Sequence, residues 1–399
     1  METSNIRLGD CVICNPSVKL EKGKECPVID IDKITVGRKF VENKDTVIYN
    51  GQGGAKFENG DTLMARITPC LENGKMAQAR IDGKGIGSTE LFVFRGKEGI
   101  TDNEFVYYLF KQQHIRDLAA NSMSGASGRQ RADLKFIKKI KLDLPTLPTQ
   151  LRIASILSAY DNLIENNNKR IRLLEQIAEN LYKEWFVRFR FPGHEKVEME
   201  NGLPKGWKYY LIRNLCEINK KTISSKNKSV LIHYLDTSSI TDNCITGYED
   251  YILEDAPSRA RRVVKHNSII LSTVRPNLRH FGIIKNPEDN TIVSTGFAVF
   301  DCKCQIANII YRYLASPEIV NYCQSIAEGA VATYPSIKPE EIGRLKIALP
   351  PLIIAQQLNN TLEVLNNQQN NLLRQNDNLS RQRDLLLPRL MSGKLEVKE

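Results

Sequence analysis

The chain has 399 residues, which is long for one typical domain and predicts two or three. Hydrophobic residues make up 41% and charged residues 26%, as in a globular protein with real cores. The formal net charge of +10 favours a polyanionic partner, because neutralised phosphates release counterions. No secretory signal and no apolar run of the roughly 18 residues needed to span a membrane is visible, so we expect a cytoplasmic protein.

In chain order, short β-rich runs separated by turn signals come first and a long helical pattern follows. This order then occurs a second time. Strands are expected at 46–49, 91–94, 268–271 and 297–300, and helices at 104–120 and 307–325. The two long helical patterns begin after Leu144-Pro145 and after Leu349-Pro350.

The chain therefore contains an internal repeat. Leu349 lies 205 residues after Leu144, and other pairs of segments keep nearly the same offset. The matching segments are 88–94 with 294–300, 60–69 with 267–276 and, more loosely, 13–15 with 217–219. We expect two related α/β domains of common size, each followed by a long helix.

Both long helices keep a heptad pattern, with mostly apolar residues that alternate in steps of four and three. In the first helix these are Ile153, Leu157, Tyr160, Ile164, Asn167, Ile171, Leu174, Ala178, Leu181 and Trp185. In the second they are Leu358, Leu362, Leu365, Gln369, Leu372, Asn376, Leu379, Arg383, Leu386 and Leu390. Such a seam predicts helix pairing of the coiled-coil type. The alternative is that each helix covers only its own domain, although that favours a wider apolar face.

Polar residues within the seam are typical of a specified register. We expect Asn167 of the first helix to meet Gln369 and Asn376 of the second. Antiparallel pairing would place the two domains at opposite ends of the coil, related by a pseudo-two-fold axis. The predicted fold class is thus α+β, with two pseudo-symmetric α/β domains joined by two long antiparallel coiled-coil helices.

Nine cysteines occur without a repeating frame, and their odd number is typical of reduced thiols. Cys11 and Cys14 form a CxxC pair, and Cys302 and Cys304 form a CxC pair. Neither has a second pair at a spacing that zinc would require. We therefore expect core thiols and no metal site.

Several segments resemble the specificity subunits of Type I restriction–modification enzymes. Residues 144–157, ending in 184–189, resemble their central conserved region, and 349–352 with 385–394 resemble the distal one. Leu203-Pro-Lys-Gly-Trp207 resembles the entry to a target-recognition domain. The resemblance divides the chain into a first target-recognition domain (1–145), a central helix (146–190), a second target-recognition domain (191–349) and a distal helix (350–392).

The resemblance also implies a function. Each target-recognition domain would contact one half of a split DNA target, and the paired helices would set the unread gap. The family works with two modification (methyltransferase) subunits and two restriction (motor-nuclease) subunits. Those partners would bring S-adenosylmethionine, ATP and Mg²⁺, and this chain would hold no cofactor.

The residues themselves predict no catalysis. No phosphate-binding loop with its glycine-lysine spacing and no methyltransferase motif is present, and five scattered histidines suggest no acid–base pair. Two other functions stay open. One is a structural coiled-coil protein whose globular ends bind other proteins, and the other is a nuclease–methyltransferase fusion, which the missing motifs disfavour.

Candidate DNA-binding residues follow two equivalent strands, where polar and cationic side chains could meet base edges and phosphates. A solvated basic loop without a partner is the alternative for any one of them. In the first half the candidates are Arg66, Asn73, Lys75, Arg129 and Arg131. In the second half they are Arg259, Arg261, Arg262, Lys265, Thr273, Arg275, Asn277, Arg279 and His280.

Three aromatic residues end the first long helix: Trp185, Phe186 and Phe189. Such residues are more often core than interface. If they are exposed, they are candidate anchors for a methyltransferase subunit, because aromatic residues dominate binding hot spots.

Overall fold

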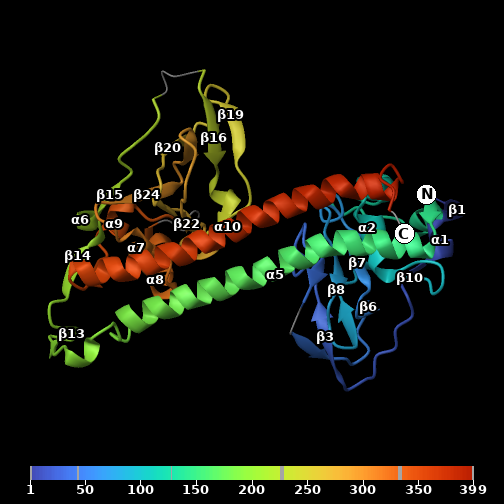
Figure 1. The fold of residues 1–399 in the computed structure, drawn as a ribbon, viewed down its shortest axis with the longest axis horizontal. Coiled ribbons are helices and arrows are strands. Elements are labelled where there is room, and N and C mark those ends of the chain that lie inside the picture. The colour runs from blue at the N-terminus through green and yellow to red at the C-terminus, as the bar shows by residue number, and fades with distance from the viewer. Residues whose placement is uncertain (1, 43–44, 127, 225–228, 331–334, 398–399) are drawn as a thin grey trace. The chain divides into compact units, whose positions relative to one another are not determined.

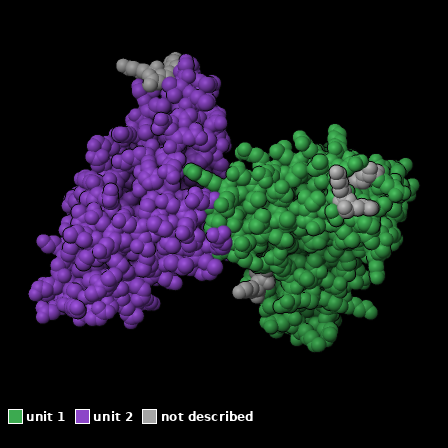
Figure 2. All heavy atoms as spheres, viewed as in Figure 1, with its two compact units in different colours: residues 1–169, 372–399 green, residues 170–371 purple. Residues whose placement is uncertain are grey.

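The computed structural model describes residues 2–42, 45–126, 128–224, 229–330 and 335–397. The chain forms two compact units, which Figure 2 shows in different colours. Unit 1 consists of Met1–Lys169 with Leu372–Glu399, and unit 2 consists of Arg170–Asn371. Each unit thus contains one globular domain and one half of each of two 40-residue helices, α5 (Leu147–Phe186) and α10 (Leu352–Met391) (Figure 1).

The globular domain of unit 1 is built on two sheets. Its strands are β1 (Thr3–Arg7), β2 (Val12–Cys14), β3 (Glu25–Ile29), β4 (Phe40–Val41), β5 (Thr46–Ile48), β6 (Ala55–Glu58), β7 (Thr62–Ala65), β8 (Met76–Ala79), β9 (Lys84–Gly87), β10 (Leu91–Gly96) and β11 (Lys141–Pro145). One sheet has the order β2-β10-β7-β8-β4 and the other β5-β3-β9-β6. A separate pair, β1 with β11, joins the start of the domain to the strand that leads into α5.

Unit 2 repeats this arrangement. Its strands are β12 (Met199–Glu200), β13 (Leu203–Pro204), β14 (Lys208–Leu211), β15 (Cys216–Ile218), β16 (Leu231–Leu235), β17 (Ile240–Thr241), β18 (Cys244–Ile245), β19 (Glu249–Ile252), β20 (Ala260–Val263), β21 (Ile269–Ser272), β22 (Phe281–Ile283), β23 (Thr291–Ser294), β24 (Phe297–Cys302) and β25 (Lys346–Leu349). The two main sheets have the orders β15-β24-β21-β22 and β19-β16-β23-β20, and β14 pairs with β25.

The repeat extends to the pairing of individual residues. Phe94 of β10 faces Cys14 of β2, and Phe300 of β24 faces Ile218 of β15. The same strand pair is parallel in both units, β3 with β9 and β16 with β23. Unit 1 has a second parallel pair, β4 with β8. The internal repeat predicted from the sequence is therefore a repeat of the whole domain fold.

An asparagine follows the first strand of the main sheet in each unit and is held in the same way. Asn15 and Asn219 both have positive φ, of 51° and 54°, a conformation that asparagine tolerates better than most residues. The Asn15 Oδ1 accepts from the Val93 amide at 2.9 Å, and the Asn219 Oδ1 accepts from the Val299 amide at 2.8 Å. This fastens the segment after the strand to the neighbouring strand.

Short helices cover the sheets, and they differ from the expected ones in one respect. They are α1 (Leu8–Cys11), α2 (Asn103–Lys111), α3 (Gln113–Asn121) and α4 (Leu134–Lys139) in unit 1, and α6 (Ile212–Leu215), α7 (Ala307–Leu314), α8 (Pro317–Ala330) and α9 (Pro339–Gly343) in unit 2. Each helix expected as continuous, at 104–120 and 307–325, is divided in two. Gln112 is extended, with ψ of 132°, and Pro317 cannot continue the preceding helix because it lacks an N–H.

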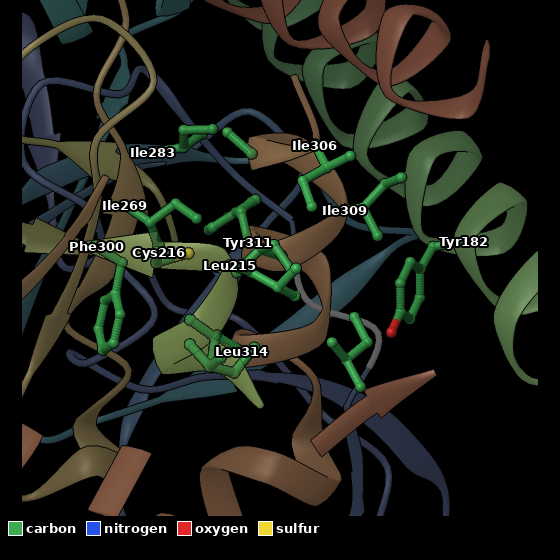
Figure 3. Packing of buried hydrophobic residues seen from close by; sticks show 14 of the residues in the cluster. Tyr182, Leu215, Cys216, Ile269, Ile283, Phe300, Ile306, Ile309, Tyr311 and Leu314 are labelled. Carbon is green, nitrogen blue, oxygen red and sulfur yellow. The ribbon is translucent and has the colours of Figure 1, made fainter. Parts of the chain in front are cut away.

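The long helices share a hydrophobic core with the domain of each unit. In unit 2, Ala178 and Tyr182 of α5 and Leu358 of α10 belong to one cluster with α7 and the sheet containing β21 and β24. Figure 3 shows Ile309, Tyr311 and Leu314 of α7 between Tyr182 and the sheet residues Ile269 and Phe300. In unit 1, Ile153 and Leu157 of α5 and Leu390 of α10 pack with α2 in the same way. Neither helix is therefore separable from its domain without exposing a core.

The aromatic residues at the end of α5 belong to this core, which corrects the proposed anchor role. Trp185 is 8% exposed, and the rings of Phe186 and Phe189 each lie 5.3 Å from that of Trp207. Phe186 also stacks on Tyr182. Because Trp185 is buried and Phe186 and Phe189 are half-buried against the same core, we do not propose Trp185, Phe186 and Phe189 as contacts for a methyltransferase subunit.

The two long helices run antiparallel in each unit, as their contacts show. In unit 1 the Asn167 Nδ2 donates to the Asn376 Oδ1 at 3.0 Å, and the Asn376 Nδ2 donates to the Asn168 Oδ1 at the same distance. The expected contact of Asn167 with Asn376 is thus present. Gln369 lies in unit 2, where its Nε2 donates to Glu175 at 3.0 Å and to the Ile171 carbonyl at 3.3 Å.

The seam positions are covered along both helices. Buried members are Ile153, Leu157, Ile164, Asn167, Ala178, Trp185, Leu358, Leu362, Gln369, Leu372, Arg383 and Leu390. Half-buried members are Tyr160, Ile171, Leu174, Leu181, Leu365, Asn376, Leu379 and Leu386. Arg383 is 1% exposed and forms an ion pair with Asp161, which is 3% exposed and also accepts a hydrogen bond from the Tyr108 hydroxyl at 2.5 Å.

We predict that Asp161→Ala lowers the free energy of unfolding of the chain by about 3 kcal/mol, because it leaves a buried arginine without its buried partner. The remaining carboxylate of Asp384 is half exposed and replaces only part of the interaction. Chemical denaturation measures the loss. The control is Asp377→Ala, whose ion pair with Arg381 is exposed and should contribute less than about 0.5 kcal/mol. Equal losses in the two variants would contradict the prediction.

Candidate nucleic-acid interface

The two loops predicted to contact DNA occupy equivalent positions in the two units. The loop after β7 is bridged to a second loop through Ile67 and Arg131, and the loop after β21 is bridged through Val274 and Ser336. The backbone bonds also match, since the Thr68 amide donates to the Gln130 carbonyl and the Arg275 amide to the Pro335 carbonyl. Each loop is therefore held at its base in the same way.

In unit 1 the loop residues differ in availability. Asn73 is exposed, and its backbone amide donates to the Pro69 carbonyl. The Nζ of Lys75 is half-buried and donates to the Ile31 carbonyl at 3.1 Å, so this cation supports the loop from within. Arg66 lies at the end of β7, with its guanidinium 5.1 Å from the centroid of the Phe92 ring.

Arg129 and Arg131 lie on the second loop of unit 1 and are both exposed. Arg131 forms an ion pair with Glu90 at 2.6 Å, and its hydrogen bonds lower the pKa of that carboxyl. The Arg129 side chain has no hydrogen bond or ion pair with any residue that the structure describes. Arg129 is thus the more available of the two for a phosphate.

In unit 2 the loop after β21 contains a short helical turn, η3 (Pro276–Leu278), between two residues with positive φ. These are Arg275, at 47°, and Arg279, at 59°. The Asn277 amide donates to the Gln324 Oε1 on α8 at 3.1 Å, while the Asn277 side chain is exposed. The turn presents Arg275 and Asn277 at the surface.

Arg279 and His280 connect this loop to the hairpin formed by β17 and β18. The Arg279 Nε donates to Asp242 at 2.5 Å, and the His280 Nδ1 lies 2.7 Å from the Ile240 carbonyl. Gly282 follows them, and a Cβ atom there would lie 2.6 Å from the Ile240 side chain, so a larger residue would displace that side chain. In this structure both side chains brace the loop.

The remaining candidates of unit 2 surround β20. Arg259 is exposed and lies 3.5 Å from Asp236, and the Lys265 side chain is exposed. The Arg261 guanidinium donates to the Ala260 carbonyl at 2.9 Å. Arg262 is half-buried, and the Thr273 hydroxyl donates to the Gly296 carbonyl at 2.9 Å.

Sequence reasoning missed one cation of unit 1, Lys56 on β6, which lines the same cavity as Arg66. It is half-buried, and its Nζ lies 5.0 Å from the centroid of the Tyr49 ring. The repeat gives no signal for it. Lys56 faces Ile86, and the residue that faces the corresponding Ile292 is the apolar Val263.

The described residues contain no group of three or more His, Cys, Asp or Glu side chains placed to hold a metal ion. Cys11 is buried and Cys14 is half-buried, and the Sγ atoms of Cys216 and Cys302 lie 3.3 Å apart on paired strands. Burial raises the pKa of the Cys11 and Cys14 thiols to about 11. In the same part of the chain, no helix is long and apolar enough to cross a membrane.

Comparisons with known proteins agree with the repeat. A family model described as the Type I restriction modification DNA specificity domain matches the chain twice, over residues 6–176 and 204–379. The specificity subunit of the Type I restriction enzyme MjaIX from Methanocaldococcus jannaschii is 26% identical over 312 residues, which cover 76% of this chain and 71% of that protein. The MjaVIII specificity subunit of the same organism is 25% identical over 335 residues, covering 79% of this chain and 75% of that protein.

A solved structure has the same fold. The S subunit of a Type I restriction–modification system from M. genitalium has a TM-score of 0.57 and 14% sequence identity, over 98% of this chain and 96% of that one. At this sequence identity, the structural similarity is evidence for a shared fold alone. The two matches to the family model span most of the chain, and the chain therefore belongs to the Type I restriction–modification DNA specificity family.

Proposed function

We propose that this chain is the DNA-recognition subunit of a Type I restriction–modification complex. Each unit would recognise one half of a bipartite target, and the helices α5 and α10 would set the unread gap between the halves. The observation that supports this most directly is the repeat, because two copies of one domain are each built onto part of the same helix pair. A single continuous target would need no such duplication.

The proposed DNA contacts are the exposed polar and cationic residues of the equivalent loops. They are Asn73 and Arg129 in unit 1 and Arg259, Lys265, Arg275 and Asn277 in unit 2. Lys75, Arg131, Arg279 and His280 would hold those loops in shape through the contacts described above. The net charge of +10 adds attraction to the phosphate backbone that does not depend on base sequence.

Catalysis would belong to the partners. We propose two modification subunits that bind S-adenosylmethionine and two restriction subunits that use ATP and Mg²⁺, all placed on DNA by this chain. The proposal assigns no bond-making or bond-breaking step to the chain itself. Its own chemistry would be the hydrogen bonds and ion pairs that distinguish one duplex sequence from another.

Sequencing that maps methylated bases in cells tests this function. We expect cells with this chain and an active cognate modification subunit to methylate a two-part motif with a fixed gap, and to lose that methylation when the chain is deleted. The modification subunit alone is the control. Unchanged methylation after deletion would contradict the proposal and favour a protein-binding scaffold.

The helices also predict how the gap responds to length. The 32-residue step from Ile153 to Trp185 corresponds to about 48 Å of helix at 1.5 Å per residue. Along B-DNA this is roughly 14 base pairs. Four residues inserted into α5 add about 6 Å, and we expect the methylated motif to gain a longer gap with both half-sites unchanged. A motif with a changed half-site and the original gap would show that the length of the helices does not set the gap.

A further inference from the structure

Most partly buried lysines and arginines of unit 1 have a polar partner in the chain. The pairs are Lys39 with Glu104, Lys75 with the Ile31 carbonyl, Arg80 with Glu42, Arg95 with Asp61, Lys111 with Asp384, Arg116 with Gln113 and Arg383 with Asp161. Lys56 and Arg66 differ: both are half-buried, and the side chain of neither forms a hydrogen bond or ion pair with any described residue. A partly desolvated cation without a partner is costly, which suggests that an anion from outside the chain completes the site.

The two unpaired cations line the same cavity, which has a volume of about 420 Å³. Its other polar lining comes from Asn15, Ser17 and Thr89, and no carboxylate lines it. The other large cavities found in the described part of the chain each have at least one carboxylate in their lining. The carboxylate of Glu90, which acts on Arg66 through space, is already bound by Arg131. The cavity thus presents cations, hydroxyls and an amide, the groups that bind an anion.

Unit 2 does not repeat this pair of cations. Lys56 of β6 faces Ile86 of β9, and in the repeat Ile86 corresponds to Ile292 of β23, which faces Val263 of β20. The counterpart of Lys56 is therefore the apolar Val263. The site belongs to the first domain alone.

We propose that Lys56 and Arg66 together bind a backbone phosphate of the target DNA. The proposal rests on the proposed DNA recognition and adds a contact that is independent of base sequence. The lysine supplies a point charge and the arginine a planar pair of donors, and a phosphate can accept both.

The test measures the salt dependence of DNA binding by the full chain assembled with its modification subunits. The variant is Lys56→Gln, assayed on a duplex with the methylated motif and on a scrambled duplex. We expect it to reduce the slope of log K against log salt by about one on both duplexes. Between 50 and 200 mM salt, one lost contact corresponds to about a fourfold smaller fall in affinity. Lys56→Arg should keep the original slope.

Two further variants provide matched controls. Lys139→Gln removes an exposed lysine of α4, and Arg344→Gln removes an exposed arginine that pairs with Glu341. We expect both to keep the original salt slope. We expect the thermal midpoint of Lys56→Gln to match that of the wild type, because no internal ion pair is lost.

Three results would overturn the proposal: an unchanged slope, a methylated motif with a changed half-site, which would indicate base contacts, or a lowered thermal midpoint, which would indicate a structural role. A different result would show that the proposed function itself is wrong. In that case the wild-type assembly would bind the motif and the scrambled duplex equally well, whatever the variants do.

Discussion

The shared core between each domain and the helix pair is the constraint on which the structure depends. Neither α5 nor α10 can bury its apolar stripe alone, and both sheets containing the loops rest on that stripe through α2 or α7. Folding of the domain and pairing of the helices are therefore one process in each unit. The loops after β7 and β21 therefore each have a fixed position relative to the part of the helix pair in their own unit. The helices can set the spacing between two half-sites only when these positions are fixed.

The contacts between each domain and the helix pair involve equivalent positions in the two units but different residue types. Tyr108 of α2 and Arg312 of α7 correspond in the repeat, and both reach the long helices. Tyr108 donates to Asp161, which pairs with Arg383, whereas Arg312 pairs with Glu175 and donates to Asn366 at 3.3 Å. Burial alone would raise the pKa of Glu175, but its bonds with Arg312 lower it. Buried networks that differ between the units favour one register of the helices over slipped alternatives.

Much of the fold was predictable because its strongest signals are periodic. The heptads located both long helices, and the offset between Leu144 and Leu349 identified the repeat. The breaks within the two shorter expected helices were not predicted. Gln112, for example, ends α2 by adopting an extended conformation that no composition signal marks. The candidate site was predicted less well, because the sequence shows which residues are positively charged but not which residues they contact in the fold. Arg279 holds its loop in place because Asp242, distant in sequence, lies beside it. Lys56 was not predicted because its counterpart in the repeat is the apolar Val263.

The central claim is that each unit recognises its half of the target independently and that the helices alone relate the halves. It is tested most directly by a chain in which residues 208–349 are replaced by a copy of residues 4–144, the segment that matches them in the repeat. The measurement is the methylated motif in cells that also contain the modification subunit. The account predicts a symmetric motif, with the half-site of the first domain present twice in inverted orientation and with the original gap. A motif that keeps the old second half, or that changes the first, would contradict it.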